Sequence, residues 1–308
     1  MTAERSPERT PAGTSVRTSV RTSEVAHVTA ADLADEKRGR AVTLCFPCRD
    51  EAATIGELVT AARRALVERT GLVDELLVLD DRSTDDTAAV ATAAGATVID
   101  IRTIHATHGD GHGKGNALWA ALQASHGEVV VFCDGDVTSF RPDWVAHLAA
   151  PLLVDDGIEL VKAMYERPTT RGGGGRTTEL VARPLLSLCA PELAGVAQPL
   201  SGEFAGRRRS LEAIPFVQGW GVEIAMLIDL AAAHSPSAIS QVDLGVRFHR
   251  HRSLHSLSVQ AAEVMATALR RLQPGLEQVA TTLTRADGSV VPLNLAERPP
   301  VRTTRSGA

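Results

Sequence analysis

Short, almost wholly apolar runs alternate with segments of helical spacing from residue 42 to residue 153. The apolar runs predict buried strands at 42–46, 76–79, 96–101 and 128–133. The segments after them predict helices at 54–69, 84–94, 115–125 and 142–153. Strands that are apolar on both faces and alternate with helices are typical of a parallel sheet covered on both sides. The pattern therefore predicts an α/β fold of the Rossmann type, mostly parallel, with helices on both faces.

The second half of the chain is less regular, and both ends are polar. It predicts strands at 158–163 and 239–242 and helices at 178–188, 221–233 and 256–272. Before the sheet, Thr29 and Asp32 have the spacing of a capping box that opens a short helix. We therefore expect four parts: a disordered tail at 1–28, an α/β half at 29–165, a smaller half at 166–273 and a loose tail at 274–308.

Composition bears on the partners of the protein and on its location in the cell. A net charge of −5 gives no reason to expect a nucleic-acid partner. No apolar stretch is long enough to span a membrane, and the polar N-terminus lacks the apolar core of a signal peptide, so we expect a cytoplasmic protein. Cys45 and Cys48 form a CxxC, but it lies in a predicted strand without a second pair of ligands, which favours a structural role.

The segment Asp134-Gly135-Asp136 follows the apolar run at 128–133 directly. Acidic pairs are common in solvated turns, yet carboxylates placed right after so apolar a run are hard to explain as surface residues. Ligands bind at the carboxyl ends of strands in open α/β sheets. Hard cations such as Mg²⁺ take oxygen ligands and share their shell with substrate phosphates and water. The pair therefore predicts a cation held against the diphosphate of a nucleotide sugar.

Other polar segments around the predicted strand ends have two interpretations each. Glu51 could accept hydrogen bonds from a nucleoside, or serve as a carboxylate near a helix N-terminus. Helix capping explains residues 83–86 but not Asp80 and Asp81 at the end of the second strand. Lys114, between two glycines at a predicted helix start, suits a phosphate, although the spacing is not that of a P-loop. The histidines upstream of it, His105, His108 and His112, favour a mobile solvated loop over a zinc site.

The second half carries three further candidate sites. Arg176 and Thr178 open a predicted helix and suit an anionic acceptor, or simply end a flexible linker. Glu223, near the start of an otherwise apolar helix, could hold sugar hydroxyls or act near the helix cap. His249, in a basic run, could complete a metal shell begun by Asp136, with arginines beside a diphosphate; alone, that run is a charged surface stretch.

Together these segments resemble a family, the retaining GT-A glycosyltransferases that make glucosyl-3-phosphoglycerate in actinobacteria. The resemblance spans about residues 41–266. The strings that carry it are long and unusual: DDT at 85–87, GKG at 113–115, VVFCDGD at 130–136, LVK at 160–162, GGGRTTELVARPLL at 173–186, QPLSGE at 198–203, GVEI at 221–224 and LGVRFH at 244–249.

The resemblance implies a GT-A fold whose α/β half binds the nucleotide sugar and whose smaller C-terminal half binds the acceptor and completes the metal site. It implies transfer of glucose from a nucleotide diphosphate glucose, UDP-glucose by preference, to the 2-hydroxyl of D-3-phosphoglycerate, with Mg²⁺ or Mn²⁺ and a homodimer. The implied donor-binding residues are Pro47, Glu51, Asp81, Lys114, Asp134, Gly135, Glu223 and Arg247. The implied acceptor-binding residues are Gly175, Arg176, Thr178 and His251. The implied metal ligands are Asp134, Asp136 and His249, and the implied catalytic residues are Lys114, Asp136 and Glu223.

Three positions depart from the family pattern. Asp81 stands where a serine is usual, Gly135 replaces the serine between the two aspartates, and His251 replaces an asparagine near the acceptor. Three alternatives stay open: a mannose donor or another small anionic acceptor, a nucleotidyltransferase, and a nucleotide-sugar-binding protein without turnover. A nucleotidyltransferase would call for a glycine-rich basic loop after the first strand, where this chain has Pro47 to Glu51.

Overall fold

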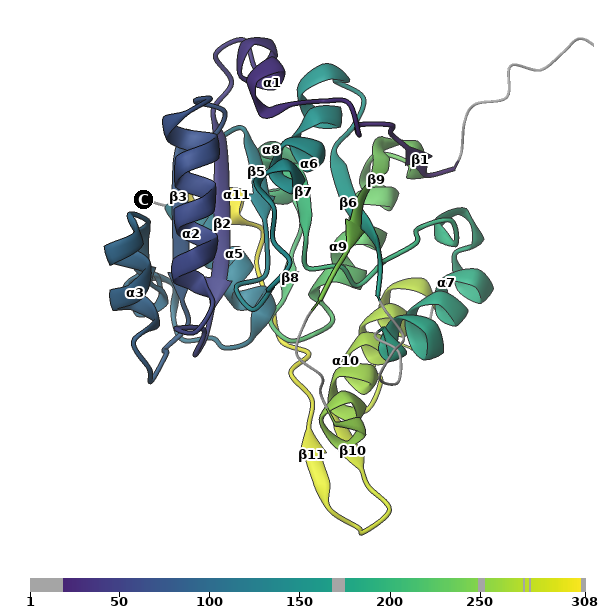
Figure 1. Ribbon diagram of the computed structural model, residues 1–308. Coiled ribbons are helices and arrows are strands. Elements are labelled where there is room, and N and C mark those ends of the chain that lie inside the picture. Colours follow the sequence, from purple (N-terminus) through teal and green to yellow (C-terminus); the bar gives the residue numbers. More distant parts are fainter. Residues whose placement is uncertain (1–18, 168–174, 249–252, 274, 277, 306–308) are drawn as a thin grey trace, which may run out of the picture.

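An eight-stranded sheet forms the centre of the computed structural model, which describes residues 19–167, 175–248, 253–273, 275–276 and 278–305 (Figure 1). The strands of this sheet are β1 (Arg21–Thr22), β2 (Val42–Cys48), β3 (Glu75–Asp80), β4 (Thr97–Asp100), β5 (Val129–Phe132), β6 (Leu160–Glu166), β7 (Phe204–Arg207) and β9 (Ile239–Val246). Their order is β1-β9-β6-β7-β5-β2-β3-β4, and β7 alone in this sheet runs antiparallel to its neighbours. The predicted mostly parallel α/β sheet is confirmed, and it continues without a break across the two predicted halves.

Helices cover both faces of the sheet. They are α1 (Ala30–Glu36), α2 (Ile55–Ala62), α3 (Thr87–Ala94), α4 (Ile101–His108), α5 (Lys114–Ala124), α6 (Pro142–Val154), α7 (Arg183–Cys189), α8 (Arg208–Leu211), α9 (Val222–Ala233), α10 (Leu254–Leu272) and α11 (Val301–Arg305). Wider π turns continue α2 at Arg63–Glu68 and precede α7 at Thr178–Ala182. None of the described helices is both long and apolar enough to cross a membrane.

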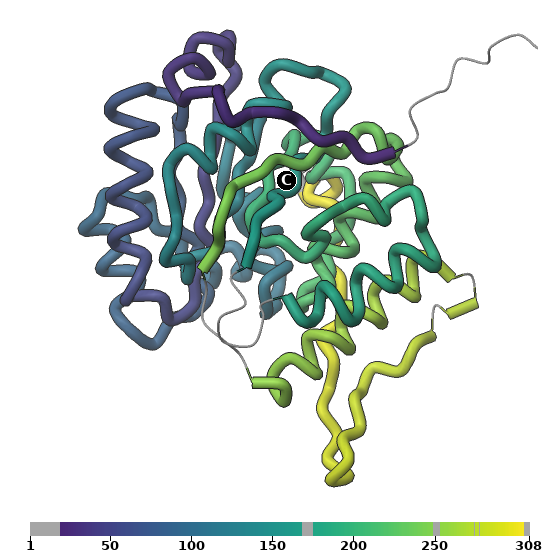
Figure 2. The backbone as a smooth tube through the Cα atoms, turned by 45° about the vertical axis from the view of Figure 1, so that its right-hand side comes forward, coloured from purple at the N-terminus to yellow at the C-terminus, as the bar shows by residue number. Residues whose placement is uncertain are grey.

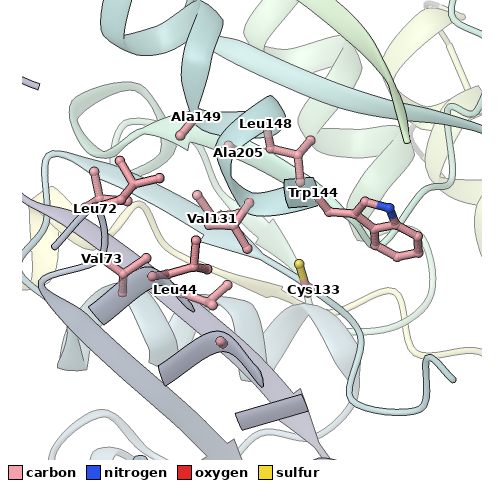
Figure 3. Close-up of a cluster of buried hydrophobic side chains, with 14 of the residues drawn as sticks. Leu44, Leu72, Val73, Val131, Cys133, Trp144, Leu148, Ala149 and Ala205 are labelled. Carbon is pink, nitrogen blue, oxygen red and sulfur yellow. The ribbon is translucent and has the colours of Figure 1, made fainter. Parts of the chain in front are cut away.

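Alternate residues of each strand enter one of two apolar layers. Leu44 and Val131 belong to the layer under α1, α2 and α6, where they lie near Trp144 (Figure 3). Cys45 and Val130, their neighbours along the strands, belong to the opposite layer, which α5, α7, α9 and α10 cover. This two-sided burial is the physical reason why the strands read as continuous apolar runs. All four cysteines are free thiols, and Cys45 and Cys48 are buried, while the structural role expected for the CxxC stays a prediction.

The chain ends differ from the predicted tails. Within the predicted disordered segment 1–28, residues 21–22 form β1, which pairs in parallel with β9, and Val25 is buried (Figure 2). Thr29 and Asp32 form the predicted capping box. Residues 1–18 lie outside the described part.

The segment 274–308 is not a loose tail where it is described. It forms a hairpin of β10 (Thr282–Thr284) and β11 (Val290–Pro292), then β12 (Glu297–Arg298), which pairs with β8 (Phe216–Val217). Figure 1 shows the hairpin projecting beyond α10 before the chain returns to the sheet. Val301 of α11 is fully buried in the layer formed by α5.

Two further local predictions were wrong. The helix after β3 begins at Thr87 rather than at residue 84, because the polar residues before it bond to the loop after β2. The segment expected to be a mobile histidine loop is largely helix α4, and His105 on it is buried and hydrogen-bonded to Asn116.

Arg207 on β7 provides a test of how the antiparallel strand is fixed. Its buried guanidinium donates to the carbonyls of Ile158, Leu152 and Asp155 at 2.8, 2.8 and 3.0 Å, where α6 ends. Substitution R207M leaves these acceptors without their donor, and we expect a loss of about 3 kcal/mol in the free energy of unfolding. Chemical denaturation measures this loss. The neighbouring variant R209M removes an exposed guanidinium that pairs with the buried carboxylate of Glu159, which keeps its hydrogen bond from Ser210, and should cost less, about 1 kcal/mol. Equal losses of unfolding free energy in R207M and R209M would contradict the role of Arg207 in fixing β7.

Candidate functional site

Two adjoining pockets lie beyond the carboxyl ends of β2, β3 and β5. The wide pocket has a volume of about 470 Å³ and is lined by residues of the loops after these strands, including Pro47, Glu51, Asp81, Gly135 and, across from them, Asn294. The inner pocket, of about 130 Å³, is lined by Gly175, Arg176, Thr178, Glu223 and Arg247. Lys114, Asp134, Asp136 and Trp220 line both pockets. The residues predicted to bind a donor and those predicted to bind an acceptor thus meet at one place.

Asp134 is held between two cations at this junction. Its Oδ1 accepts from Nζ of Lys114 at 2.8 Å, and its Oδ2 accepts from Nη2 of Arg247 at 2.8 Å. Burial opposes ionisation of Asp134, but the charges of Lys114 and Arg247 outweigh it and lower the pKa of the carboxyl to about 2. Asp134 is therefore ionised at any physiological pH.

Each of the two cations has a second carboxylate partner. Lys114, the first residue of α5, lies 2.8 Å from Oε1 of Glu223, the second residue of α9. The acids beside Lys114 raise its pKa despite burial. Arg247 donates from Nε to Oε1 of Glu203 at 2.9 Å, and Glu203 is fully buried. The result is a chain of alternating charges: Glu223, Lys114, Asp134, Arg247 and Glu203.

Glu203 is a site residue that the sequence analysis missed. It immediately precedes β7, a strand of four residues that includes a glycine and shows no apolar run. Glycine before it is required by packing, since a Cβ at Gly202 would lie 2.3 Å from the carboxylate oxygens of Asp134. The signal in the sequence is the string at 198–203, one of those that carry the family resemblance.

Lys162 on β6 was also missed and lies beneath the same network. It is buried, donates to the carbonyl of Ser201 at 2.6 Å and lies over the ring of Phe204. Burial lowers the pKa of its amine to about 8, although Glu223 acts in the opposite direction. The loop before β7 is thus anchored by a lysine whose pKa is lowered by burial.

Polar residues after β2 and β3 divide into two sets. Thr84 donates to Oδ1 of Asp50 at 2.7 Å, and Ser83 accepts from the backbone of Asp50, so these side chains fasten the two loops together. Asp81 instead faces the wide pocket. It is 5% exposed, burial raises its pKa, and its Oδ1 makes no hydrogen bond and lies 3.5 Å from Arg82. An acceptor of this kind inside a pocket can receive a hydrogen bond from a ligand.

Asp136 is the carboxylate with room for a cation. Both oxygens of Asp134 already accept hydrogen bonds, whereas the ion pair of Asp136 with Arg247 is long, at 4.0 Å. Among the described residues, no three His, Cys, Asp or Glu side chains form a metal-binding group. Magnesium and manganese ions at nucleotide sites are often held by one or two carboxylates together with phosphate oxygens and water. The residues at the junction fit such an ion.

Two predicted residues cannot be placed. His249, predicted as a metal ligand, and His251, predicted near the acceptor, lie outside the described residues. The described part of the chain adds pocket residues that the sequence analysis did not single out for a role in the site, among them Trp220, Glu263 and Asn294. The roles of all predicted site residues stay predictions at this point.

Comparison with known proteins yields one family. The pattern described as Glycosyl transferase family 2 matches residues 43–214. A relative named glucosyl-3-phosphoglycerate synthase from Mycolicibacterium paratuberculosis is 43% identical over 294 residues, covering 90% of this chain and 88% of the relative. A relative of the same name from Petrotoga mobilis is 43% identical and covers 77% of this chain and 75% of that protein.

Solved structures agree. The glucosyl-3-phosphoglycerate synthase of Mycobacterium tuberculosis in complex with Mn²⁺, UDP-glucose and phosphoglyceric acid is 41% identical, with a TM-score of 0.85 over 93% of this chain and 99% of that one. The same enzyme has been solved with Mn²⁺, UDP and glucosyl-3-phosphoglycerate, again with a TM-score of 0.85.

The buried amine of Lys162 makes stability depend on pH. Its pKa is about 8 in the folded chain and 10.5 in the reference state, so between these values the unfolded chain binds more protons. Stability then rises with pH across this window, because the cost of the buried charge is present below about pH 8 and disappears as the amine deprotonates. Substitution K162M removes the charge, and we expect the wild type to gain about 2–3 kcal/mol relative to K162M between about pH 8 and pH 10.

Urea denaturation of both proteins at several pH values measures this difference. Titration of all other groups is common to the two proteins and cancels in the comparison. Parallel curves of unfolding free energy against pH would contradict the lowered pKa.

Proposed function

The chain belongs to glycosyl transferase family 2 and, within it, to the glucosyl-3-phosphoglycerate synthases, and from this premise we propose the reaction that it catalyses. It transfers glucose from UDP-glucose to the 2-hydroxyl of D-3-phosphoglycerate, keeps the anomeric configuration and requires Mg²⁺ or Mn²⁺. The observation that carries the proposal is the meeting of the two pockets at Lys114, Asp134 and Asp136. A donor spread along the wide pocket would bring its sugar to the acceptor in the inner pocket.

The donor would lie with its nucleoside toward Pro47, Glu51 and Asp81 and its diphosphate toward Lys114 and Asp136. The two acidic side chains at the nucleoside end offer acceptors for N–H and O–H groups of the base and ribose. A cation bound at Asp136, with Asp134 beside it and His249 as a further ligand, would offset the charge that develops on the leaving diphosphate.

The acceptor would be held by Gly175, Arg176 and Thr178, with His251 as the further predicted contact. Arg176 offers a planar set of donors that matches a carboxylate or a phosphate. The acceptor is an anion with both groups, so this end of the inner pocket suits it in charge.

In the reaction, the acceptor oxygen forms a bond to the anomeric carbon on the face from which the diphosphate leaves. The bond between that carbon and the diphosphate oxygen breaks, the electron pair stays on the diphosphate, and the acceptor proton passes to a phosphate oxygen. Glu223 would orient the sugar through its hydroxyls. Its carboxylate is paired with Lys114 at 2.8 Å, which makes it a poor covalent nucleophile.

The proposal also covers the place of action and the assembly of the protein. We propose a cytoplasmic site of action, because a nucleotide sugar and a phosphorylated glycerate are metabolites of the cell interior. The homodimer implied by the resemblance stays a prediction.

A turnover panel tests the reaction. UDP-glucose, GDP-glucose, UDP-mannose and GDP-mannose are each supplied with and without D-3-phosphoglycerate, with Mg²⁺, Mn²⁺ or a chelator. We expect release of UDP from UDP-glucose that requires both phosphoglycerate and the metal. Glycerol 3-phosphate is a useful second acceptor, since the M. tuberculosis enzyme has been solved with it. UDP release at the same rate with and without phosphoglycerate would contradict phosphoglycerate as the acceptor. Faster turnover with a mannose donor than with UDP-glucose would show that mannose is the transferred sugar.

The variant D136N tests the metal site. Loss of one anionic ligand weakens cation binding and removes stabilisation of the leaving group, so we expect kcat to fall by about two orders of magnitude or more. Binding of Mn²⁺ in the presence of UDP, followed by electron paramagnetic resonance, should weaken in parallel. The exposed variant D156N is the matched control and should change neither quantity. A folded D136N protein with a normal rate and normal Mn²⁺ affinity would exclude Asp136 as a ligand.

A further inference from the structure

The C-terminal segment Leu293–Arg298, which we call the strap, reaches the loop that carries Lys114. Arg298 is 6% exposed, and each of its three guanidinium nitrogens donates one hydrogen bond. Nη1 donates to the carbonyl of His108 at 2.9 Å, Nη2 to the carbonyl of Gly109 at 2.8 Å, and Nε to Oδ1 of Asn116 at 2.8 Å. The guanidinium also lies 4.9 Å from the ring of Trp119. One side chain therefore joins the end of α4 to the first turn of α5.

The loop between these two helices is short and leads directly into Lys114, which lines both pockets. It ends at Gly113, whose φ of +99° is accessible to glycine at little cost, and Lys114 follows as the first residue of α5. Gln218 holds it from the other side, since its side chain accepts from the backbone of His112 at 3.1 Å. The backbone of Gln218 in turn donates to Ala296 of the strap at 2.8 Å.

A second part of the strap lines the wide pocket itself. Nδ2 of Asn294 donates to the carbonyl of His112 at 2.8 Å. The backbone of Asn294 donates to Oε1 of Glu263 at 2.8 Å, and the backbone of Trp220 donates to Oε2 of the same carboxylate at 2.7 Å. Glu263 is 4% exposed. The strap, α10 and the Trp220 turn are thereby fastened together at the mouth of the wide pocket.

We propose that the strap is the outer wall of the donor site and that Arg298 is a positioning residue for Lys114; the inference rests on the proposed function. Without the guanidinium, two helix-end carbonyls and the buried amide oxygen of Asn116 lose their donor. The start of the loop at 109–113 then loses its link to α5, although Gln218 and Asn294 still hold His112, and the first turn of α5 shifts relative to Asp134 and Glu223. Donor binding suffers, whereas the acceptor end of the inner pocket, formed by Gly175, Arg176 and Thr178, is untouched.

This assignment predicts a split between the two substrates. For the variant R298Q we expect the KM for UDP-glucose to rise about ten- to hundredfold, and the affinity for UDP with Mn²⁺ measured by calorimetry to fall by a similar factor. The KM for phosphoglycerate should stay within about twofold. A residue that only stabilises the fold would lower the amount of active protein and leave both KM values unchanged.

The matched control is R271Q. Arg271 binds the same segment through Glu297 at 2.9 Å and also binds Asp229, but it does not contact the loop at 109–113. Its loss should leave both KM values unchanged. An equal rise of donor KM in R271Q and R298Q would overturn a specific role for Arg298.

The variant N294A keeps the proposal testable if R298Q does not fold. Asn294 is partly exposed and loses one hydrogen bond, so the protein should fold and its donor KM should rise about threefold to tenfold. An unchanged donor KM in N294A, or in a folded R298Q, overturns the proposal. Failure of the proposed function is distinguishable: wild type without turnover on phosphoglycerate contradicts the function, while UDP affinity of the variants still decides the role of the strap.

Discussion

The partly buried carboxylate of Asp134 is the constraint on which the rest of the site depends. An ion largely removed from water needs compensating charges, and here Lys114 and Arg247 supply one each, at 2.8 Å. Lys114 is partly buried and Arg247 is buried, and each is balanced by a further acid, Glu223 or Glu203. These five side chains come from α5, from α9 and from the segments after β5, before β7 and after β9. Removing one partner leaves an uncompensated charge, at a cost of about 3–5 kcal/mol, so the arrangement fixes five segments of the chain at once.

The same network gives a physical reason for the metal ion in the proposed reaction. Three acids and two bases leave an excess of one negative charge, counted over Asp134, Glu203, Glu223, Lys114 and Arg247. Although Lys114 and Arg247 face the pockets, carboxylates already neutralise them. Arg49 in the wide pocket and Arg167 and Arg176 in the inner pocket add positive charge, but a diphosphate beside Asp136 would still meet that carboxylate. A divalent cation held at Asp136 would supply positive charge where the leaving group forms. The protein cations then orient the donor rather than carry its charge.

Local sequence pattern was sufficient to predict most strands of the sheet and the acidic pocket residues at their carboxyl ends. Apolar runs are a local property, and the carboxyl ends of parallel strands meet at one edge, which brings Asp81 and Asp136 to one pocket without knowledge of the fold. What local pattern missed depends on distant partners. Strand β7 has four residues and a glycine, so it becomes a strand only between β5 and β6. Helix α4 is rich in polar residues, and burial of His105 requires Asn116 and Arg82.

The C-terminal strap shows the same limit most clearly. From residue 274 onward the chain is polar and contains several prolines, and it lacks the periodicity of a helix or a buried strand. It is attached by a two-residue pairing of β12 with β8 and by single side chains that donate to backbone carbonyls, and no sequence pattern marks either kind of contact. Arg298 binds carbonyls 189 and 190 positions earlier. Closing so long a loop costs little more than closing one half its length, about 0.6 kcal/mol. One fully used guanidinium can therefore hold a polar segment against the site, and the segment's composition gives no indication of it.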